Sequence, residues 1–432
     1  MPLRHSVEEI ELQSGARGLL IDAPGSTVVA YNFHFRAGFN YADESKYQTA
    51  HIMEHLTCGS NQDYPSTELF SREFNKNGAR YNATTSEYNM SYTAECAVME
   101  WERILNLEQA AITRPEFTQK ALDREKSNVK EEVTGYINEH QRFLWKSIKK
   151  SMGYPGVSDA ESVKTIDDIQ LYDVEKHHEK THTLENMRFT IAADLSTFKN
   201  EIINNLNQWD LPVGNRLPVP KVQLKSSPMV YVSRKDLTNH IYRLHIVIDR
   251  EMSESEILSM RILNYLLTGT FHSRIYGEAR SRGLCYGISS SCYNNISGNA
   301  LWEIYGQVGD NNAKALFQLI VDQITKVVDG DVSEKELEDA KLFYTGNYQM
   351  RHQTTKELSD WYSTEYFNYE LIDYLDQYPG LIQSITLDSI VELAKEYIEK
   401  GYWTLGFVSS APEGQLQPHY DSLSKLLKNG AK

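Results

Sequence analysis

The chain shows the same succession of hydrophobic patterns twice: an alternating run typical of a strand, followed by a pattern typical of a helix. The run STVVAYNFHFRAG near residue 26 alternates as a half-buried strand does, and so does HIYRLHIVID near residue 240. Each run leads into a helical pattern, over residues 42–56 and 252–267, through acidic and serine residues suited to helix capping. The pattern predicts two α+β domains, each a sheet covered by helices.

A proline-rich stretch separates the two repeats of this pattern. Residues 211–228, LPVGNRLPVPKVQLKSSP, hold four of the 12 prolines of the chain, together with glycine, serine and lysine. Such a stretch cannot continue a helix or a central strand, so it predicts a linker. The expected domains are residues 1–210 and residues 229–432.

The second half looks like a degenerate copy of the first. A shift of 211 residues places Leu56-Thr57 over Leu267-Thr268. In that register the second helix has apolar or aromatic residues where the first has His51, Glu54 and His55. We interpret the halves as an ancient duplication in which only the first kept polar groups suited to catalysis.

Composition narrows the class of protein. The 432 residues carry 44 basic and 59 acidic side chains, so the net charge is 44 − 59 = −15, which disfavours nucleic acid and anionic membrane surfaces as partners. The four scattered cysteines do not form a disulfide framework. With no apolar signal segment and no run of about 18 apolar residues, we expect a cytoplasmic protein.

The segment HIMEH is the most specific chemical signal. His51 and His55 are one helical turn apart, so both imidazoles can reach one metal ion, and Glu54 lies beside them. The order H-x-x-E-H is the inverted form of a zinc-site motif, and a catalytic zinc needs three protein ligands and one open position. The alternative is a surface helix with two solvated histidines.

A second segment, HEKTH, matches the forward order H-E-x-x-H. It contains His178, Glu179 and His182, and a metal site here would use both histidines with the glutamate as base. However, MRFTIAAD follows as a strand, and no third ligand is evident downstream. We interpret this segment as a solvated helix end that also holds His177.

Candidates for the third zinc ligand occur on the charged helix expected from Pro115. Glu125 and Glu132 are seven residues apart, about two turns, and therefore share a face. Glu131 is a neighbouring alternative. Because an acidic helix face is usually solvated, the residues alone leave the third ligand open.

HIMEH followed by Glu132 after 76 intervening residues resembles the pitrilysin or insulinase family of inverted-motif zinc peptidases. Other segments share this resemblance: FRAGFNYAD, GARYNATTSEYNMSY, KTHTLENMRFTIAAD and SRIYGEARSRGLCYGISSS. The matches span most of the chain and are most similar to the two-domain subfamily that includes bacterial peptidases like the mitochondrial processing peptidase. The resemblance implies two homologous domains, each with a mainly antiparallel sheet.

The resemblance also implies roles for the first-domain residues. His51, His55 and Glu132 would bind one zinc ion per chain, and Glu54 would be the general base. Glu125 would support the metal site through a hydrogen bond. The gap of 76 residues favours Glu132 over its neighbour as the ligand.

Further site residues are implied for substrate binding. Asn82 and Ala83 would lie on an edge strand that pairs with an extended peptide. Arg280 and Tyr286 would lie near the substrate carbonyl and the developing oxyanion. The second-half segment is one residue shorter than the family pattern before its Gly-Leu pair, so Arg282 competes for the arginine role.

In the family, four domains enclose a chamber, and this chain supplies two. The resemblance therefore implies a homodimer in which Arg280 and Tyr286 act in trans on the partner's zinc site. The expected function is a zinc endopeptidase that cleaves extended oligopeptides. The alternatives are a peptidase dedicated to one precursor or leader peptide, and a non-catalytic peptide-binding scaffold subunit of the same fold.

Overall fold

The protein, given by a computed structural model that describes residues 2–430, divides into two compact units. Each unit is built from three separate segments of the chain. The units therefore differ from the contiguous halves expected from the linker, because the chain exchanges two segments between them. The first unit contains residues up to Gly135, Asp159–Pro220 and Tyr348–Asp373, and the second contains Tyr136–Ser158, Lys221–Asn347 and residues from Tyr374 onward.

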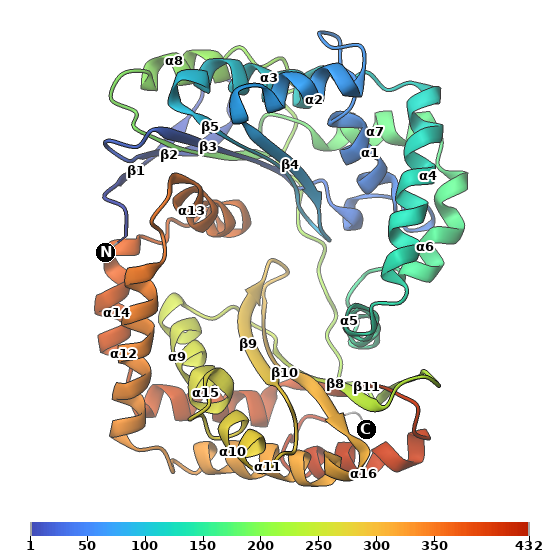
Figure 1. Cartoon of the computed structure of the whole chain (residues 1–432), viewed down its shortest axis with the longest axis vertical. Coiled ribbons are helices and arrows are strands. Elements are labelled where there is room, and N and C mark those ends of the chain that lie inside the picture. The colour runs from blue at the N-terminus through green and yellow to red at the C-terminus, as the bar shows by residue number, and fades with distance from the viewer. Residues whose placement is uncertain (1, 431–432) are drawn as a thin grey trace. The chain divides into compact units, whose positions relative to one another are not determined.

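The first unit is built on a six-stranded sheet (Figure 1). Its strands are β1 (Ser6–Glu11), β2 (Arg17–Asp22), β3 (Val28–Phe35), β4 (Arg80–Thr85), β5 (Met90–Ala97) and β6 (Met187–Ala193). Their order is β1-β2-β6-β3-β5-β4. The β2–β6 pair is parallel and the other four pairs are antiparallel, which confirms the mainly antiparallel sheet. Strand β4 forms one edge.

Helices cover both faces of this sheet, as Figure 1 shows. The expected half-buried pattern of β3 is wrong: all but its first residue are buried, because α13 (Thr355–Tyr369) covers the second face. The polar residues of β3 meet polar partners there, since Asn32 donates a hydrogen bond to Ser359 Oγ at 2.9 Å. The helices on the first face are α2 (Thr67–Asn75), α3 (Trp101–Thr113) and α8 (Lys199–Leu206).

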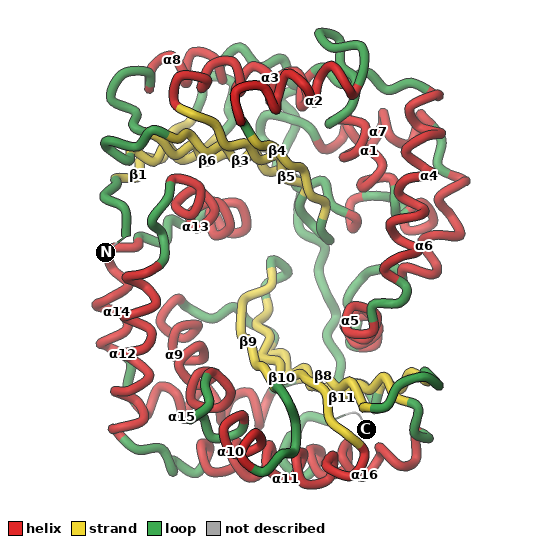
Figure 2. The backbone as a smooth tube through the Cα atoms, viewed as in Figure 1, coloured by secondary structure: helices red, strands yellow, loops and turns green. Residues whose placement is uncertain are grey.

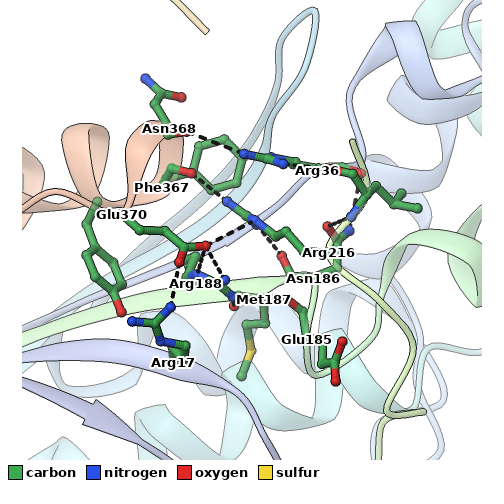
Figure 3. A network of polar contacts seen from close by, with 12 residues as sticks. Arg17, Arg36, Glu185, Asn186, Met187, Arg188, Arg216, Phe367, Asn368 and Glu370 are labelled. Atoms are coloured by element: carbon green, nitrogen blue, oxygen red, sulfur yellow. Dashed lines mark hydrogen bonds and ion pairs between the residues drawn. The ribbon is translucent and has the colours of Figure 1, made fainter. Parts of the chain in front are cut away.

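Glu370 directly follows α13 and ties this helix to the sheet (Figure 3). Its carboxylate pairs with Arg188 on β6 and with Arg17 on β2, the latter at 2.5 Å, while Arg216 Nε lies 3.8 Å away. Burial, together with the charges of Arg36 and Arg188, lowers the pKa of Arg216 to about 8. One carboxylate thus holds several guanidinium groups, so α13 is docked by charge as well as by packing.

Four more helices complete the first unit. Helix α1 packs against α7 and against the edge strand β4. Their bounds are α1 (Thr49–Thr57), α4 (Gln119–Tyr136), α6 (Asp159–Thr165) and α7 (Leu171–Thr181).

The second unit is built on a five-stranded sheet of the order β7-β11-β8-β10-β9. Its strands are β7 (Val230–Ser233), β8 (Asn239–Ile248), β9 (Ile288–Asn295), β10 (Asn299–Gly309) and β11 (Tyr402–Ser409). The β7–β11 pair is parallel and the other three pairs are antiparallel. Removing β1 from the first sheet leaves the same order and the same single parallel pair, which supports a duplication.

Helix α5 (His140–Ser151) packs on one face of this second sheet. It is encoded in the first half of the chain, as α13 is encoded in the second, so the exchange is reciprocal. Gly406 on β11 permits close packing, because a Cβ there would lie 2.7 Å from Leu144 and from Ile148. Both faces of the central strands β3 and β8 are consequently buried over most of their length. The remaining helices are α9 (Glu254–Asn264), α10 (Tyr276–Ser281), α11 (Asp310–Val328), α12 (Glu334–Met350), α14 (Tyr378–Ser384), α15 (Leu387–Lys400) and α16 (Glu413–Ser424).

The proline-rich stretch 211–228 forms neither helix nor strand (Figure 2). Its beginning is bonded to the first unit, since Leu184 N donates to Pro212 O at 2.9 Å. Its end is bonded to the second unit, since Lys225 N donates to Met152 O at 3.1 Å. Among residues 2–430, no helix has the length and apolar character needed to cross a bilayer.

Candidate metal centre

Helix α1 carries the inverted histidine motif. The acidic residues expected to cap this helix belong instead to a preceding turn, Glu44–Lys46, which Asp43 caps with its side chain. Within α1, His51 and His55 are one helical turn apart, and their ring centroids are separated by 4.8 Å. The helix therefore presents both imidazoles on one face, as the spacing predicted.

Helix α4 supplies the acidic side of the site. The expected start of this helix at Pro115 is wrong, because Pro115 still forms an isolated bridge with Asn61 and the helix begins at Gln119. Glu125 and Glu132 lie on the face of α4 that meets α1, and each lies within 4 Å of a histidine of the motif. Two helices that are distant in sequence thus share one polar site.

His51, His55 and Glu132 form a cluster suited to a metal ion, with one ligand atom of each residue within 4.8 Å of the others. Glu132 Oε2 lies 3.6 Å from His51 Nε2 and 3.7 Å from His55 Nε2. Two ligands of a tetrahedral zinc ion are about 3.4 Å apart, and both distances from Glu132 to the histidines exceed this by only a few tenths of an ångström. Two imidazoles and one carboxylate are also a ligand set typical of catalytic zinc.

The other ring nitrogen of each histidine has its own partner. His51 Nδ1 lies 3.1 Å from Gln48 Oε1, and His55 Nδ1 lies 3.1 Å from Glu125 Oε2. Because each of these partners is an acceptor, each Nδ1 carries the proton, and Nε2 of both rings faces Glu132 with its lone pair. The tautomers therefore suit metal binding.

Electrostatics at His55 match this arrangement. The hydrogen bond from His55 lowers the pKa of Glu125 to about 2, so this residue is a carboxylate at neutral pH. Burial alone would lower the pKa of His55, but the hydrogen bond to Glu125 and the nearby acidic side chains raise it. A fixed negative charge behind the imidazole increases its basicity, which strengthens a metal bond at Nε2.

Glu54 lies on α1 beside the two histidines, and Thr85 at the end of β4 holds it in place. Thr85 Oγ1 donates a hydrogen bond of 2.6 Å to Glu54 Oε2. Burial raises the pKa of Glu54, and the hydrogen bond from Thr85 opposes part of that shift. A carboxylate with a raised pKa next to a metal cluster is suited to accept a proton.

The structure separates the two candidates for the third ligand. Glu132 belongs to the cluster, whereas Glu131 is exposed and lies outside it. Two supporting residues, Gln48 and Thr85, were missed from the sequence. Gln48 could have been suspected because it lies one turn before His51, but nothing in the sequence links Thr85 to Glu54.

Asn82 and Ala83 lie in the middle of the edge strand β4. They pair with Thr93 and Tyr92 of β5, and Thr93 Oγ1 also donates to Asn82 O at 3.2 Å. No described strand pairs with the opposite edge of β4. Strand β4 ends at Thr85, which contacts Glu54, so a peptide added at this edge would lead toward the metal cluster.

Arg280 and Tyr286 lie together in the second unit. The Arg280 guanidinium stacks over the Tyr286 ring at 4.4 Å, and Arg280 Nη1 donates to Tyr286 O at 3.4 Å. The Tyr286 side chain is 84% exposed, and both residues line a hollow of about 630 Å³. Arg282 instead pairs with Glu278 at 3.8 Å. The structure therefore brings together Arg280, not Arg282, with the tyrosine.

The forward motif does not form part of a metal cluster in the described chain. His178 lies in the last turn of α7, and His182 directly follows the end of this helix. The expectation of a solvated helix end is wrong, because His177 and His182 are 5% and 0% exposed. Residue Glu179, the candidate base of this motif, points into solvent.

Comparisons with known proteins show the family of this chain. Residues 17–153, which include the whole metal cluster, match the description "Insulinase (Peptidase family M16)", and residues 168–343 match "Peptidase M16 inactive domain". The chain belongs to this insulinase family. The insulinase description covers the segment that holds the metal cluster, whereas the inactive-domain description covers most of the second unit's sheet.

Relatives of this insulinase-family chain match it over nearly its whole length, and two solved structures share its fold. The uncharacterized zinc protease YmxG of Bacillus subtilis is 20% identical, over 95% of this chain and 99% of its own length. A protease of Helicobacter pylori has a TM-score of 0.83 at 16% identity, over 95% of this chain and 100% of its own. A peptidase M16 inactive-domain protein of Pseudomonas fluorescens also has a TM-score of 0.83, at 19% identity, over 94% and 98%.

Proposed function

We propose that this protein is a zinc-dependent endopeptidase that cleaves extended oligopeptides. The observation that carries the proposal is the cluster of His51, His55 and Glu132, with the half-buried carboxylate of Glu54 beside it. A scaffold subunit would not need a base and three metal ligands in one place. Nor would it need hydrogen-bond acceptors that fix the tautomer of each histidine. Membership of the insulinase family supports the same reaction class.

The chain's own residues account for the proton transfers of peptide hydrolysis. Zinc, when bound, acts as a Lewis acid that lowers the pKa of a coordinated water and polarises a carbonyl. Glu54 accepts the proton of the attacking water and donates it to the leaving amine nitrogen. Because Thr85 holds Oε2 of Glu54, we assign both transfers to Oε1. Burial raises the pKa of Glu54, which favours the first transfer.

Substrate binding is proposed along the outer edge of β4. A peptide there would add a strand to the sheet and form hydrogen bonds with the backbone near Asn82 and Ala83. Backbone pairing selects an extended, unfolded segment and reads few side chains. The proposed substrates are therefore flexible peptides.

The test uses paired variants of the two motifs and of the two neighbouring acids. Chelation should abolish cleavage of an unstructured peptide, and zinc should restore it. Glu54→Gln should lower kcat about 1,000-fold, while Glu179→Gln on the second motif stays near wild type. Glu132→Gln should lose zinc, whereas Glu131→Gln retains it. The opposite result in either pair would overturn the assignment.

We further propose that the enzyme works as a homodimer, with Arg280 and Tyr286 of one protomer acting on the partner's site. Their exposed stacked pair, held by the second unit, suits contact with a substrate carbonyl. Mixing Glu54→Gln with Tyr286→Phe should regenerate one intact site in each mixed dimer, which gives about a quarter of wild-type activity. No recovery, or a fully active monomer in sedimentation, would contradict action in trans.

A peptide library distinguishes the proposed degrading enzyme from a dedicated processing enzyme. Many cleavage sites across unrelated sequences would support peptide degradation. A single cut in one precursor or leader segment would support processing instead.

A further inference from the structure

The buried end of α7, next to the zinc-site helix, carries the histidines of the forward motif. The His182 ring is stacked between two other rings, Phe35 and His178, each with its centroid 4.4 Å away. Its side chain is fully buried. A polar ring enclosed in this way must have its hydrogen bonds satisfied inside the protein.

Both nitrogens of His182 have partners. Nδ1 lies 3.0 Å from Thr181 Oγ1, and Nε2 lies 2.8 Å from the hydroxyl oxygen of Tyr92. Tyr92 is on β5 and is also buried. Its hydroxyl lies 3.2 Å from Thr57 Oγ1 at the end of α1, and Thr57 Oγ1 donates to Glu54 O at 2.8 Å. A chain of polar contacts thus runs from α7 through the sheet to α1.

The number of protons available shows which group donates in each of these polar contacts. Thr181 uses its only hydroxyl proton on His177 O at 2.7 Å, so its oxygen accepts from His182 Nδ1. His182 therefore carries its proton on Nδ1, and Nε2 accepts from the Tyr92 hydroxyl. The other acceptor near that hydroxyl is Met90 Sδ at 3.1 Å, which is a much weaker acceptor than an imidazole nitrogen.

Tyr92 in turn leaves its oxygen lone pairs for Thr57. Because the Tyr92 proton goes to His182, the contact with Thr57 uses the single Thr57 hydroxyl proton, which is shared between Glu54 O at 2.8 Å and the Tyr92 oxygen at 3.2 Å. This holds the last turn of α1, which contains both Glu54 and His55. Burial lowers the pKa of His182 well below its usual value, which keeps Nε2 an acceptor at neutral pH.

We infer that His182 is a positioning residue for the zinc-binding helix, acting through the hydroxyls of Tyr92 and Thr57. The inference rests on the proposed function of the α1 cluster. It gives the second histidine motif a role: this motif does not bind the metal but fixes the helix that does. Outer residues that orient metal ligands commonly alter metal affinity tenfold or more when they are removed.

His178 provides a matched control within the same motif. It shares the ring stack with His182, but its Nε2 bonds to Ile112 O on α3 at 3.0 Å and not to the Tyr92 chain. Replacing either histidine by leucine removes a stacked imidazole. Only the change at His182 removes the acceptor on which Tyr92 and α1 depend.

The first measurement is zinc affinity, by competition with a chromogenic chelator. His182→Leu and Tyr92→Phe should bind zinc about tenfold more weakly than wild type. His182→Gln should be within about threefold of wild type, because the glutamine Oε1 is three bonds from Cβ, as Nε2 is, and can accept from Tyr92. His178→Leu should leave zinc affinity unchanged even where its melting temperature falls.

The second measurement is amide hydrogen exchange over residues 49–57 in metal-free protein. His182→Leu and Tyr92→Phe should speed exchange in this helix, and His178→Leu should not. Because zinc is absent, this result stays interpretable even if the proposed zinc site fails. The inference is overturned if His182→Leu and His178→Leu weaken zinc binding and speed amide exchange equally. It is also overturned if His182→Gln does not restore zinc affinity. Tyr92→Phe keeps the aromatic ring and removes only the hydroxyl. It therefore tests the series of contacts from His182 to Thr57 even if the leucine variants do not fold.

Discussion

Glu125 Oε2 accepts a hydrogen bond from Nδ1 of His55 at 3.1 Å, with the opposite ring nitrogen turned toward the metal cluster. The same carboxylate is held by Arg124 at 2.8 Å and by Asn128 at 3.0 Å. These contacts are arranged along one face of α4. They fix the orientation of Glu125, which in turn fixes the ring of His55, a proposed metal ligand on α1.

Replacing Glu125 by glutamine should therefore weaken zinc binding although Glu125 is not itself a ligand. The amide keeps an acceptor oxygen but loses the charge that makes His55 more basic. We expect a zinc affinity about 10-fold to 100-fold lower than that of wild type, measured by chelator competition. Glu131→Gln, an exposed change on the same helix, is the control. Equal affinities for both variants would show that Glu125 has no supporting role.

The stacked pair in the second unit predicts unequal roles for two nearby arginines. Arg280 contacts Tyr286 with both its charge and a hydrogen bond, whereas Arg282 pairs with Glu278 at the surface. Arg280→Ala should lower kcat/KM about 100-fold through a lost donor near the developing charge. Arg282→Ala should change it less than about threefold. Steady-state kinetics on an unstructured peptide measure both, and a larger loss at Arg282 would reverse the assignment.

The arrangement of the proposed zinc-site residues could be predicted from the sequence where the spacing is local. His51, Glu54 and His55 lie within one helical turn, so their relation follows from helix geometry alone. Glu132 on another helix required the resemblance to a family. The hydrogen bond from Thr85 to Glu54 depends on where β4 ends relative to α1, and no local pattern encodes that distance.

The exchanged helices could not be predicted for a related reason. An alternating strand predicts one buried face, and only the tertiary fold shows that α13 covers the other face of β3. His182 was misjudged in the same way. A polar residue at a helix end is usually solvated, but here stacked rings and a tyrosine hydroxyl enclose it. Burial of polar residues depends on partners that are remote in sequence.

Glu108 on α3 predicts a pH-dependent stability. It is 3% exposed, and burial raises its pKa to about 8. In the unfolded chain its pKa is about 4.3, so between these values the folded protein binds one more proton than the unfolded chain. The contribution of protonated Glu108 to the free energy of unfolding is therefore fully present below about pH 4 and is lost as pH rises toward 8.

Urea unfolding of wild type and Glu108→Gln between pH 6.5 and 8 measures this effect. The free energy of unfolding of wild type minus that of Glu108→Gln should fall by up to about 1.4 kcal/mol for each pH unit of increase. Only wild type loses this contribution, since glutamine does not titrate. Buried histidines such as His177, whose pKa burial lowers to about 4, are neutral in the folded protein throughout this window. A pH-independent difference would mean that Glu108 is ionised in the fold.

Glu370 predicts a local loss of stability at the exchanged helix. Glu370→Gln keeps the size of the side chain but removes the negative charge that Arg17, Arg188 and Arg216 share. Arg188 is 5% exposed, so it would lose its charge partner without gaining water. We expect a loss of about 2 kcal/mol, which is below the cost of breaking a fully buried pair because Glu370 is partly exposed.

Hydrogen exchange over residues 355–369 reports this loss directly, because it follows α13 alone. Exchange there should become about 30-fold faster in Glu370→Gln, which corresponds to about 2 kcal/mol. Lys356→Gln, which removes a solvent-exposed ion pair with Asp360 on the same helix, should change exchange far less. Equal protection of α13 in wild type and Glu370→Gln would show that packing alone docks the helix. In that case the arginines around Glu370 are held by their contacts with backbone carbonyls, such as that of Arg188 Nη1 with Glu185 O at 2.9 Å.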